Sequence, residues 1–255
     1  MAFDGRCGIV EIDEENKTVV FDAYKLKKIS GTRLAPILGM SSFSTPFKAA
    51  CELAGLYPGD KANKYIDAGN LLEPVLRDHL ASNKGVLYDA LGIPAGTPLS
   101  VDEPVEKERC GYDHFHDNKV FGGLVDGYIS VNGKRDSILE IKTSGARAKW
   151  DDGSGGDANV PMEYMLQASL YAELSGLDRI VFLVGFLEEQ DYDRAFLWRP
   201  CAENTALIVK DKLEMEPYMR EAEAWYREYM KNGYTPEWTD RDADVLKYLK
   251  AYKRR

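Results

Sequence analysis

The chain is poor in the residues that build disulfide frameworks and zinc sites. It has four cysteines and three histidines among 255 residues. The cysteines are far apart and include no Cys-x-x-Cys pair: Cys7, Cys51, Cys110 and Cys201. This spacing argues against a disulfide framework, a zinc knuckle and an iron–sulfur cluster, and it favours a protein of the reducing cytoplasm.

A long hydrophobic run is also missing. The longest apolar run, at 180–187, is far too short to span a bilayer. The N-terminus carries charges every few residues and has no apolar core, so we expect no secretory signal. Apolar residues make up 44% of the chain and charged residues 29%, as in ordinary globular proteins. The length suits one large domain or two small ones.

Positive charge is in deficit. The 33 lysines and arginines face 42 aspartates and glutamates, which gives a net charge of −9. Acidic side chains that gather in an active site can contribute to this balance, but the sum itself gives no support for DNA binding. A nucleic-acid function therefore has to be argued from particular residues.

Hydrophobic periodicity and turn residues predict a chain of mixed α/β type. Polar turns interrupt an alternating pattern at 8–22, which indicates a hairpin, and an apolar run at 179–187 indicates a central strand. Residues 85–110 are typical of strand and loop, and residues 151–159 form a glycine-rich acidic loop. Helices are expected at 33–40, 46–55, 71–83, 162–176 and 207–233, followed by a basic tail at 247–255.

Prolines mark several of the helix boundaries. Thr45 is placed to cap a helix that has Pro46 at its first position. Pro74 indicates that the helix at 71–83 begins only a residue or two before it, or bends there. Pro161 opens a helix that Gly176 ends. Since we find no repeats and no clear linker, we predict one α/β domain with a mixed sheet flanked by helices.

One predicted hairpin carries charge in an apolar context. Its β-rich runs, LVDGYISV and SILEIKTS, are joined by an Asn-Gly dipeptide, which a type I′ turn prefers. Residues two apart in a strand share a face, so Glu140 and Lys142 point to the same side. Asp126 lies on the partner strand and comes near Glu140 in such a hairpin.

Two interpretations of this hairpin compete. The first is a surface hairpin with an exposed Glu–Lys face. The second is a metal site, because a buried carboxylate is costly unless it is paired or bound to a cation. Mg²⁺ prefers hard oxygen ligands, which Asp126, Glu140 and the carbonyl of Ile141 supply. Lys142 would then orient or help to deprotonate a metal-bound water and balance phosphate charge.

The pattern D…E-x-K, in the form GLVDG…LEIKTS, resembles the PD-(D/E)XK nuclease superfamily. The proline that usually precedes the aspartate is Val125 here. A second segment, GNLLEPVLRDHL, resembles the G-x-x-x-E helix of the YqaJ and phage lambda exonuclease-like family, which implies that Glu73 joins the metal site. Taken alone, Glu73 would be interpreted as a solvated helical residue.

A third segment contains Gln167 and Tyr171 in a predicted helix. Its pattern Q-x-x-x-Y resembles the third motif of RecB-like exonucleases, and residues four apart lie on one side of a helix. The resemblance implies that Gln167 and Tyr171 orient Lys142 or the substrate strand. The alternative is a surface glutamine and a tyrosine at the edge of the core.

The segment ISGTRLAPILGMSSFSTPFKAACELAG is similar to the N-terminal signature of the YqaJ-type viral recombinase family. The resemblance implies that the hydroxyl of Thr32 and a nearby arginine, here Arg33, hold the terminal 5′ phosphate of DNA. A threonine and an arginine beside a helix start are also physically suited to an anion. The alternative is an N-cap threonine and a surface arginine.

These segments occur in the family's order over about residues 29–190. The resemblance implies a restriction-endonuclease-like core there, within a single nuclease domain at 1–255 that has a helical extension at about 203–255. It also implies a Mg²⁺-dependent exonuclease, with Mn²⁺ as a substitute, that degrades duplex DNA ends 5′ to 3′ in phage-type recombination.

The resemblance extends to assembly and partners. Relatives often form ring-shaped trimers around DNA, so we expect a homo-oligomer whose basic bore would offset an acidic exterior. The partners that it implies are duplex DNA ends and a single-strand annealing protein, in a bacterial or phage-infected cytoplasm.

Three rival functions share part of this pattern. A RecB-like module for single strands is normally tethered to a helicase, and helicase motifs are absent from the sequence. A Mg²⁺-dependent endonuclease would not be expected to show Q-x-x-x-Y. A DNA-end binding protein on a nuclease fold is disfavoured because Asp126, Glu140 and Lys142 are all intact.

Overall fold

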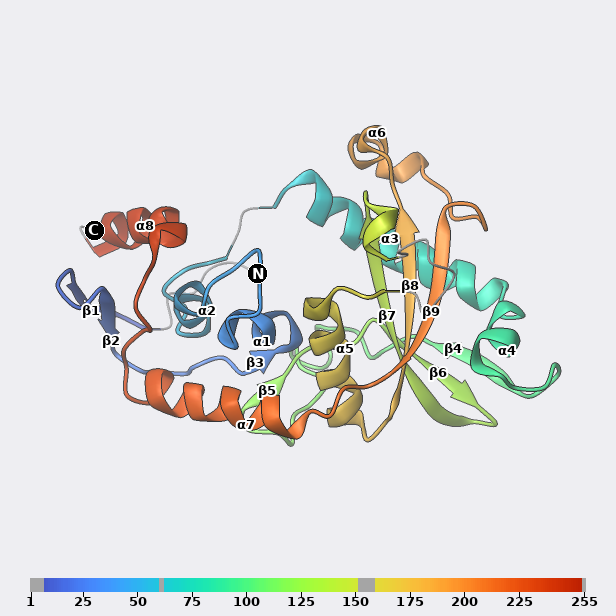
Figure 1. Ribbon diagram of the computed structural model, residues 1–255, viewed down its shortest axis with the longest axis horizontal. Coiled ribbons are helices and arrows are strands. Elements are labelled where there is room, and N and C mark those ends of the chain that lie inside the picture. The colour runs from blue at the N-terminus through green and yellow to red at the C-terminus, as the bar shows by residue number, and fades with distance from the viewer. Residues whose placement is uncertain (1–6, 60–61, 151–158, 254–255) are drawn as a thin grey trace. The chain divides into compact units, whose positions relative to one another are not determined.

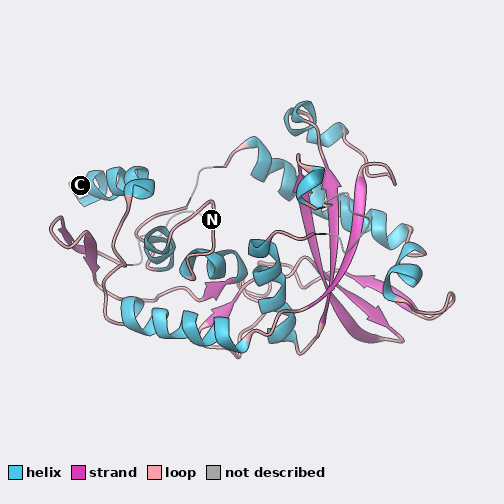
Figure 2. Cartoon of the chain, viewed as in Figure 1, coloured by secondary structure: helices cyan, strands magenta, loops and turns pink. Residues whose placement is uncertain are grey.

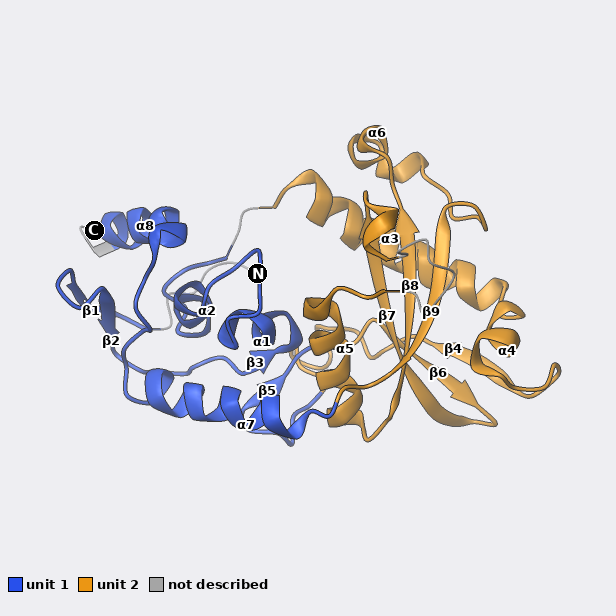
Figure 3. Cartoon of the chain, viewed as in Figure 1, with its two compact units in different colours: residues 1–60, 115–123, 214–255 blue, residues 61–114, 124–213 orange. Residues whose placement is uncertain are grey.

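The computed structural model describes residues 7–59, 62–150 and 159–253 (Figure 1). Of the acidic loop predicted at 151–159, residues 151–158 lie outside the described residues. The chain forms two compact units (Figure 3): a terminal unit of residues 1–60, 115–123 and 214–255, and a sheet unit of residues 61–114 and 124–213. Neither unit is contiguous in sequence. The single domain expected at 1–255 stays a prediction.

The sheet unit is built on a mixed five-stranded sheet (Figure 2), as the sequence predicts. Neighbouring strands run antiparallel except for the central pair, β7 and β8, which is parallel. The strand order across the sheet is β4 (Leu99–Asp102), β6 (Gly127–Val131), β7 (Lys134–Ser144), β8 (Arg179–Phe186) and β9 (Thr205–Asp211).

The predicted hairpin between β6 and β7 is present. Its turn residues Asn132 and Gly133 have φ angles of 52° and 74°, which is the left-handed backbone that a type I′ turn requires. In the register of this hairpin, Gly127 lies opposite Leu139. Asp126 therefore stands one residue before β6 and next to Glu140, rather than inside the strand.

Two helices cover opposite faces of the sheet (Figure 1). Leu139 and Ile141 point towards α3 (Lys64–Ser82), which packs Leu72, Leu76 and Leu80 on them in one apolar cluster. Each such buried leucine contributes roughly 1.5–3 kcal/mol to folding. Because side chains alternate along a strand, Glu140 faces the other side, where it contacts α5 (Met162–Ser175).

The helices of the sheet unit differ in part from the prediction. Helix α5 begins after Pro161 and ends at Gly176, as expected. The predicted start of the helix a residue or two before Pro74 is wrong, because α3 begins at Lys64 and Pro74 lies inside it. The alternative, a bend at Pro74, stays a prediction. Asn63 caps this start, accepting from the backbone N–H groups of Tyr65 and Ile66 at 3.0 and 3.1 Å.

Two further segments of the sheet unit correct the prediction. Residues 85–110 contain a short helix, α4 (Val86–Leu91), besides the strand β4. Residues 207–211, expected as helix, belong to β9, because their pairing with β8 outweighs the local helical pattern. A short helix, α6 (Glu189–Asp193), and a 3₁₀ turn at Ala195–Leu197 follow β8.

The terminal unit contains the predicted N-terminal hairpin, β1 (Ile9–Asp13) with β2 (Thr18–Phe21). A small parallel pair joins β3 (Ile29–Ser30) to β5 (Phe121–Gly122). The helices of this unit are α1 (Gly31–Ile37), α2 (Pro46–Leu53), α7 (Glu216–Trp225) and α8 (Ala243–Lys253), with a π-helical turn at Tyr226–Met230 and a 3₁₀ turn at Asp240–Asp242.

A buried aspartate ties the C-terminal segment to the start of α2. Thr45 caps α2 as expected, since its hydroxyl accepts from the N–H of Lys48 at 3.0 Å. The same hydroxyl donates to one carboxylate oxygen of Asp242, which is 1% exposed. The other oxygen accepts from the N–H and the hydroxyl of Thr239 at 2.8 and 3.0 Å. Asp242 thus joins two segments that are far apart in sequence.

We predict that Asp242→Ala lowers the free energy of unfolding by about 2–3 kcal/mol, because hydrogen bonds to a buried charged group are lost together. The measurement is urea unfolding of the full chain, followed by circular dichroism. The matched control is Asp240→Ala in the same turn, whose side chain is exposed. Equal effects of the two substitutions would contradict the prediction.

Candidate active site

Glu140 is fully buried in the middle of β7, with 0% of the residue exposed. Its oxygen Oε1 accepts from the ammonium of Lys142 and from Nε2 of Gln167, the latter at 2.6 Å. No hydrogen-bond partner of its other oxygen, Oε2, is found in the part of the chain that the structure describes. A buried carboxylate oxygen without a partner is costly, so its presence points to a ligand that would contact it.

Asp126 stands beside Glu140 at the entry to β6. Its Oδ2 accepts from the backbone N–H of Ile141 at 2.8 Å, where a backbone carbonyl of a neighbouring strand would otherwise accept. The next residue is closely packed, since a Cβ on Gly127 would lie 3.1 Å from Cδ2 of Leu139 and 3.2 Å from the carbonyl oxygen of Asp102. The bond to Ile141 holds the Asp126 carboxylate beside Glu140.

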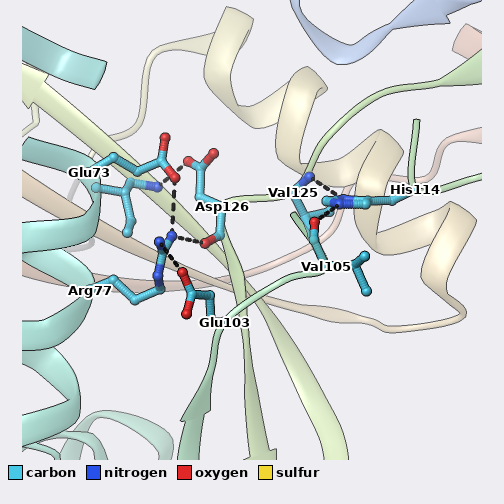
Figure 4. Close-up of polar contacts among 8 residues, drawn as sticks. Glu73, Arg77, Glu103, Val105, His114, Val125 and Asp126 are labelled. Carbon is cyan, nitrogen blue, oxygen red and sulfur yellow. Dashed lines mark hydrogen bonds and ion pairs between the residues drawn. The ribbon is translucent and has the colours of Figure 1, made fainter. Parts of the chain in front are cut away.

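Glu73, on α3, brings a third carboxylate close to Asp126 (Figure 4). Its side chain is 38% exposed, and its Oε1 accepts from Arg77 at 3.1 Å. Burial and the neighbouring Asp126 raise the pKa of Glu73, and Arg77 opposes that rise. Glu73 is therefore not a freely solvated helical residue but part of the same electrostatic group.

The carboxylates of the site disfavour each other's charge. Burial and the negative charge of Glu140 raise the pKa of Asp126 to about 7. Burial also raises the pKa of Glu140, although the adjacent Lys142 lowers it in part. A bound cation would offset this repulsion, because it favours the ionised form of each carboxylate.

Lys142 is held from two sides. Its ammonium pairs with Glu140 and lies 5.2 Å from the ring centroid of Tyr164 on α5. The Tyr164 ring stacks on Trp150 with 5.4 Å between centroids and an angle of 8°. Burial alone would lower the pKa of Lys142, but the charges of Glu140 and Asp126 outweigh it and raise the pKa. Lys142 therefore stays protonated.

The donor set fits a hard divalent cation such as Mg²⁺. The side chains at the site offer carboxylate oxygens, and one of them, Oε2 of Glu140, is buried without a hydrogen-bond partner among the described residues. Within those residues, however, no group of three or more His, Cys, Asp or Glu side chains is gathered closely enough to hold a metal ion by itself. Mg²⁺ needs only one or two carboxylates when waters complete its octahedron. The ligand set of Glu73, Asp126, Glu140 and the Ile141 carbonyl stays a prediction.

The structure brings most of the predicted residues together in the sheet unit. Gln167 is buried and donates to Glu140 rather than to Lys142, which differs from the role expected for it. Tyr171 is buried one helical turn beyond Gln167. The hydrogen bond from Gln167 fixes Oε1 of Glu140 and leaves Oε2 without a hydrogen-bond partner among the described residues.

The expected phosphate ligands belong to the terminal unit. Thr32 is the second residue of α1, so it is not the N-cap, which is Ser30. The hydroxyls of Ser30 and Thr32 are 3.0 Å apart, and NH1 of Arg33 donates to Oγ of Ser30 at 2.9 Å. Nε of Arg33 lies 3.3 Å from Oε2 of Glu52. Two hydroxyls and one guanidinium thus converge at the start of α1.

Sequence reasoning missed three residues that hold the site in place. Arg77 follows Glu73 by four positions, a helical spacing that would have suggested a pair. Tyr164 precedes Gln167 by three positions and so shares its side of α5. His114 gave no such signal: its Nδ1 accepts from the N–H of Val125 at 3.1 Å, and its Nε2 lies 2.8 Å from the carbonyl oxygen of Val105 (Figure 4).

The mixed sheet places Asp126, Glu140 and Lys142 on one hairpin, and a glutamine-bearing helix lies behind them. This arrangement defines a nuclease fold of the PD-(D/E)XK class. Comparison with known families identifies the branch. The family model described as the YqaJ-like viral recombinase domain matches residues 21–178, which is more than half of the chain. The chain belongs to this family, and its membership supports a nuclease function.

Similar proteins agree with this fold. An alkaline exonuclease from Laribacter hongkongensis, LHK-Exo, is 16% identical and covers 91% of this chain and 96% of its own, with a TM-score of 0.51. The same exonuclease in complex with dAMP gives 0.50. The uncharacterized protein MG373 of Mycoplasma genitalium is 24% identical over 277 residues, covering 91% of this chain and 93% of its own length. No helix within the described ranges is long and apolar enough to cross a membrane.

We predict that Mg²⁺ or Mn²⁺ raises the melting temperature of the protein, because a cation relieves repulsion among the carboxylates and binds the folded state preferentially. A ligand at about 100 times its Kd stabilises the folded state by about 2.7 kcal/mol. The measurement is thermal unfolding with and without EDTA, with KCl at equal ionic strength as control. An equal rise in Asp126→Asn would contradict a site at this carboxylate.

We also predict that the Tyr164 ring contributes to activity. Replacing it with leucine removes the aromatic face beside Lys142, and a partly buried cation–π contact is worth about 1–2 kcal/mol. We expect Tyr164→Leu to lower the kcat of DNA cleavage roughly tenfold. Tyr164→Phe keeps the ring and should cleave at close to the original rate. Equal kcat values for the two variants would rule out this role.

Proposed function

We propose that the protein is a Mg²⁺-dependent exonuclease that hydrolyses phosphodiester bonds of duplex DNA from its ends, in the 5′ to 3′ direction. The observation that carries the proposal is the buried Oε2 of Glu140, which has no hydrogen-bond partner among the described residues, beside Asp126 and the ammonium of Lys142. Membership of the YqaJ-like viral recombinase family supports the same chemistry.

The ligands of the metal would be Asp126, Glu140, the carbonyl of Ile141 and Glu73. When bound, Mg²⁺ would polarise the scissile phosphate and stabilise the charge on the leaving 3′ oxygen. Mn²⁺, which accepts similar oxygen ligands, would substitute for it.

Lys142 would act as a donor rather than as a base. Glu140 and Asp126 raise its pKa and so favour the ammonium form. It can donate a hydrogen bond to the attacking water or to a phosphate oxygen and offset the charge that builds up there. Gln167 would act through Glu140, whose carboxylate it keeps in place.

The cluster at the start of α1 suits the end of the substrate. Thr32 and Arg33, with the hydroxyl of Ser30, would bind the terminal 5′ phosphate through charge-assisted hydrogen bonds. Binding of this group would make cleavage begin at a phosphorylated 5′ end. By its likeness to the exonuclease that was solved with dAMP, we propose 5′-mononucleotides as products.

The assembly and the partners belong to the same proposal. The net charge of −9 disfavours DNA binding by the surface as a whole, so DNA has to meet a locally basic face. A ring-shaped homotrimer with a basic bore, in the cytoplasm of a bacterium or a phage-infected host, would provide one. A single-strand annealing protein would receive the strand that digestion exposes.

The experiment that tests this function is digestion of a linear duplex with Mg²⁺, comparing 5′-phosphorylated with 5′-hydroxyl ends. We expect faster digestion from the phosphorylated end and a loss of roughly a hundredfold or more in Lys142→Ala, as for removal of one preorganised donor.

A closed circular duplex and a single strand serve as the alternative substrates. Cutting of the circle would instead establish an endonuclease, and cutting of single strands alone would establish a RecB-like activity. Binding of ends without any metal-dependent cleavage would leave a DNA-end binding protein on a nuclease fold.

A further inference from the structure

The proposed metal site rests on a buried arginine that the catalytic pattern does not include. We propose that Arg77 is a positioning residue that fixes two of the metal ligands, Glu73 through its carboxylate and Asp126 through its backbone. This inference rests on the proposed function, because it assigns a role in binding the metal.

The guanidinium of Arg77 joins three segments of the sheet unit (Figure 4). NH1 donates to Oε1 of Glu73 at 3.1 Å and to the carbonyl oxygen of Asp126 at 2.6 Å. NH2 donates to Oε1 of Glu103, beyond the end of β4, at 3.3 Å. One side chain of α3 thereby connects its own helix with the backbone at the entry to β6.

Asp126 is consequently held at both ends. Arg77 takes its carbonyl oxygen, and the N–H of Ile141 takes its carboxylate at 2.8 Å. A residue fixed in this way cannot rotate its carboxylate away from Glu140 without breaking one of the two bonds. Metal ligands generally depend on such supporting bonds, and losing one typically weakens metal binding 10–100-fold.

Glu73 is constrained by the same group. Its Oε1 is engaged by Arg77, so Oε2 is the oxygen left for a cation. Its side chain is 38% exposed and without a partner would be free to turn into solvent. Arg77 itself is only 8% exposed. Burying a charged group costs free energy, and a surface ion pair would not require that burial.

Lysine cannot replace this arrangement. Both bonds to the proposed ligands come from NH1, whose two N–H groups the planar guanidinium holds at fixed angles, whereas an ammonium is a compact charge on a flexible stem. Arg77→Lys keeps the positive charge near the metal site but loses the planar group that directs N–H donors at the Glu73 carboxylate and the Asp126 carbonyl. Its effect therefore reports on positioning, separately from charge.

The matched control is Glu103→Gln. Glu103 bonds to the same guanidinium, but its side chain is 76% exposed and it is not a proposed ligand. If Arg77 acts only by anchoring α3 to the sheet, loss of either Glu103 or the guanidinium fork would change stability and leave metal affinity alone.

The test measures Mn²⁺ binding to the full chain by calorimetry without DNA, together with thermal unfolding in EDTA and cleavage of a linear duplex. We expect Arg77→Lys to raise the Kd for Mn²⁺ about tenfold, and Glu103→Gln to leave it unchanged. Cleavage by Arg77→Lys should recover as Mn²⁺ is raised in proportion, because the reacting groups are intact.

A folded Arg77→Lys protein that binds Mn²⁺ with the original Kd would overturn the assignment, while cleavage by the unchanged protein would leave the proposed function standing. Should the lysine variant not fold, Arg77→Gln, which retains N–H donors without the charge, replaces it under the same criterion. An unchanged protein that neither binds Mn²⁺ nor cuts DNA would refute both proposals.

Discussion

The burial of the Glu140 carboxylate in the middle of β7 is the constraint on which the site depends, because an ionised group in a sheet interior is tolerated only with partners. Lys142 and Gln167 both contact one of its oxygens, and the other is left without a hydrogen-bond partner among the described residues. Helix α5 has to run over this face of the sheet to deliver Gln167. The position of α5 is thus linked to the buried carboxylate of Glu140.

The opposite face of β7 is apolar and needs no hydrogen-bond partners. Leu139 and Ile141 lie in a continuous apolar cluster with α3, so the two faces of β7 divide stability from chemistry. Proteins commonly accept locally unfavourable groups at functional sites and compensate for them elsewhere. Here the compensation is one residue away in sequence and on the other side of the sheet. Because the strand is rigid between them, the apolar face also fixes the position of Glu140.

Local sequence was sufficient for the features that depend on neighbours in the chain. The Asn-Gly turn, the alternation around Glu140 and the boundaries of α5 follow from nearby residues, and the structure has them as expected. The start of α3 at Lys64 and the strand β9 did not follow, because the cap Asn63, which lies before the expected start at 71, and pairing with β8 decide them. At the site, residue types and their order indicated Asp126, Glu140 and Lys142, but the bond from Arg77 to a backbone carbonyl leaves no trace in a residue pattern.

The hydrogen bond between His114 and Val125 joins the two points at which the chain leaves and re-enters the sheet unit. Residues 115–123 belong to the terminal unit, where β5 pairs with β3 and Phe121 is fully buried. The bond therefore closes a loop whose interior belongs to one unit and whose ends belong to the other. Because Asp126 follows Val125 directly, this closure also limits the freedom of the backbone beside the carboxylates.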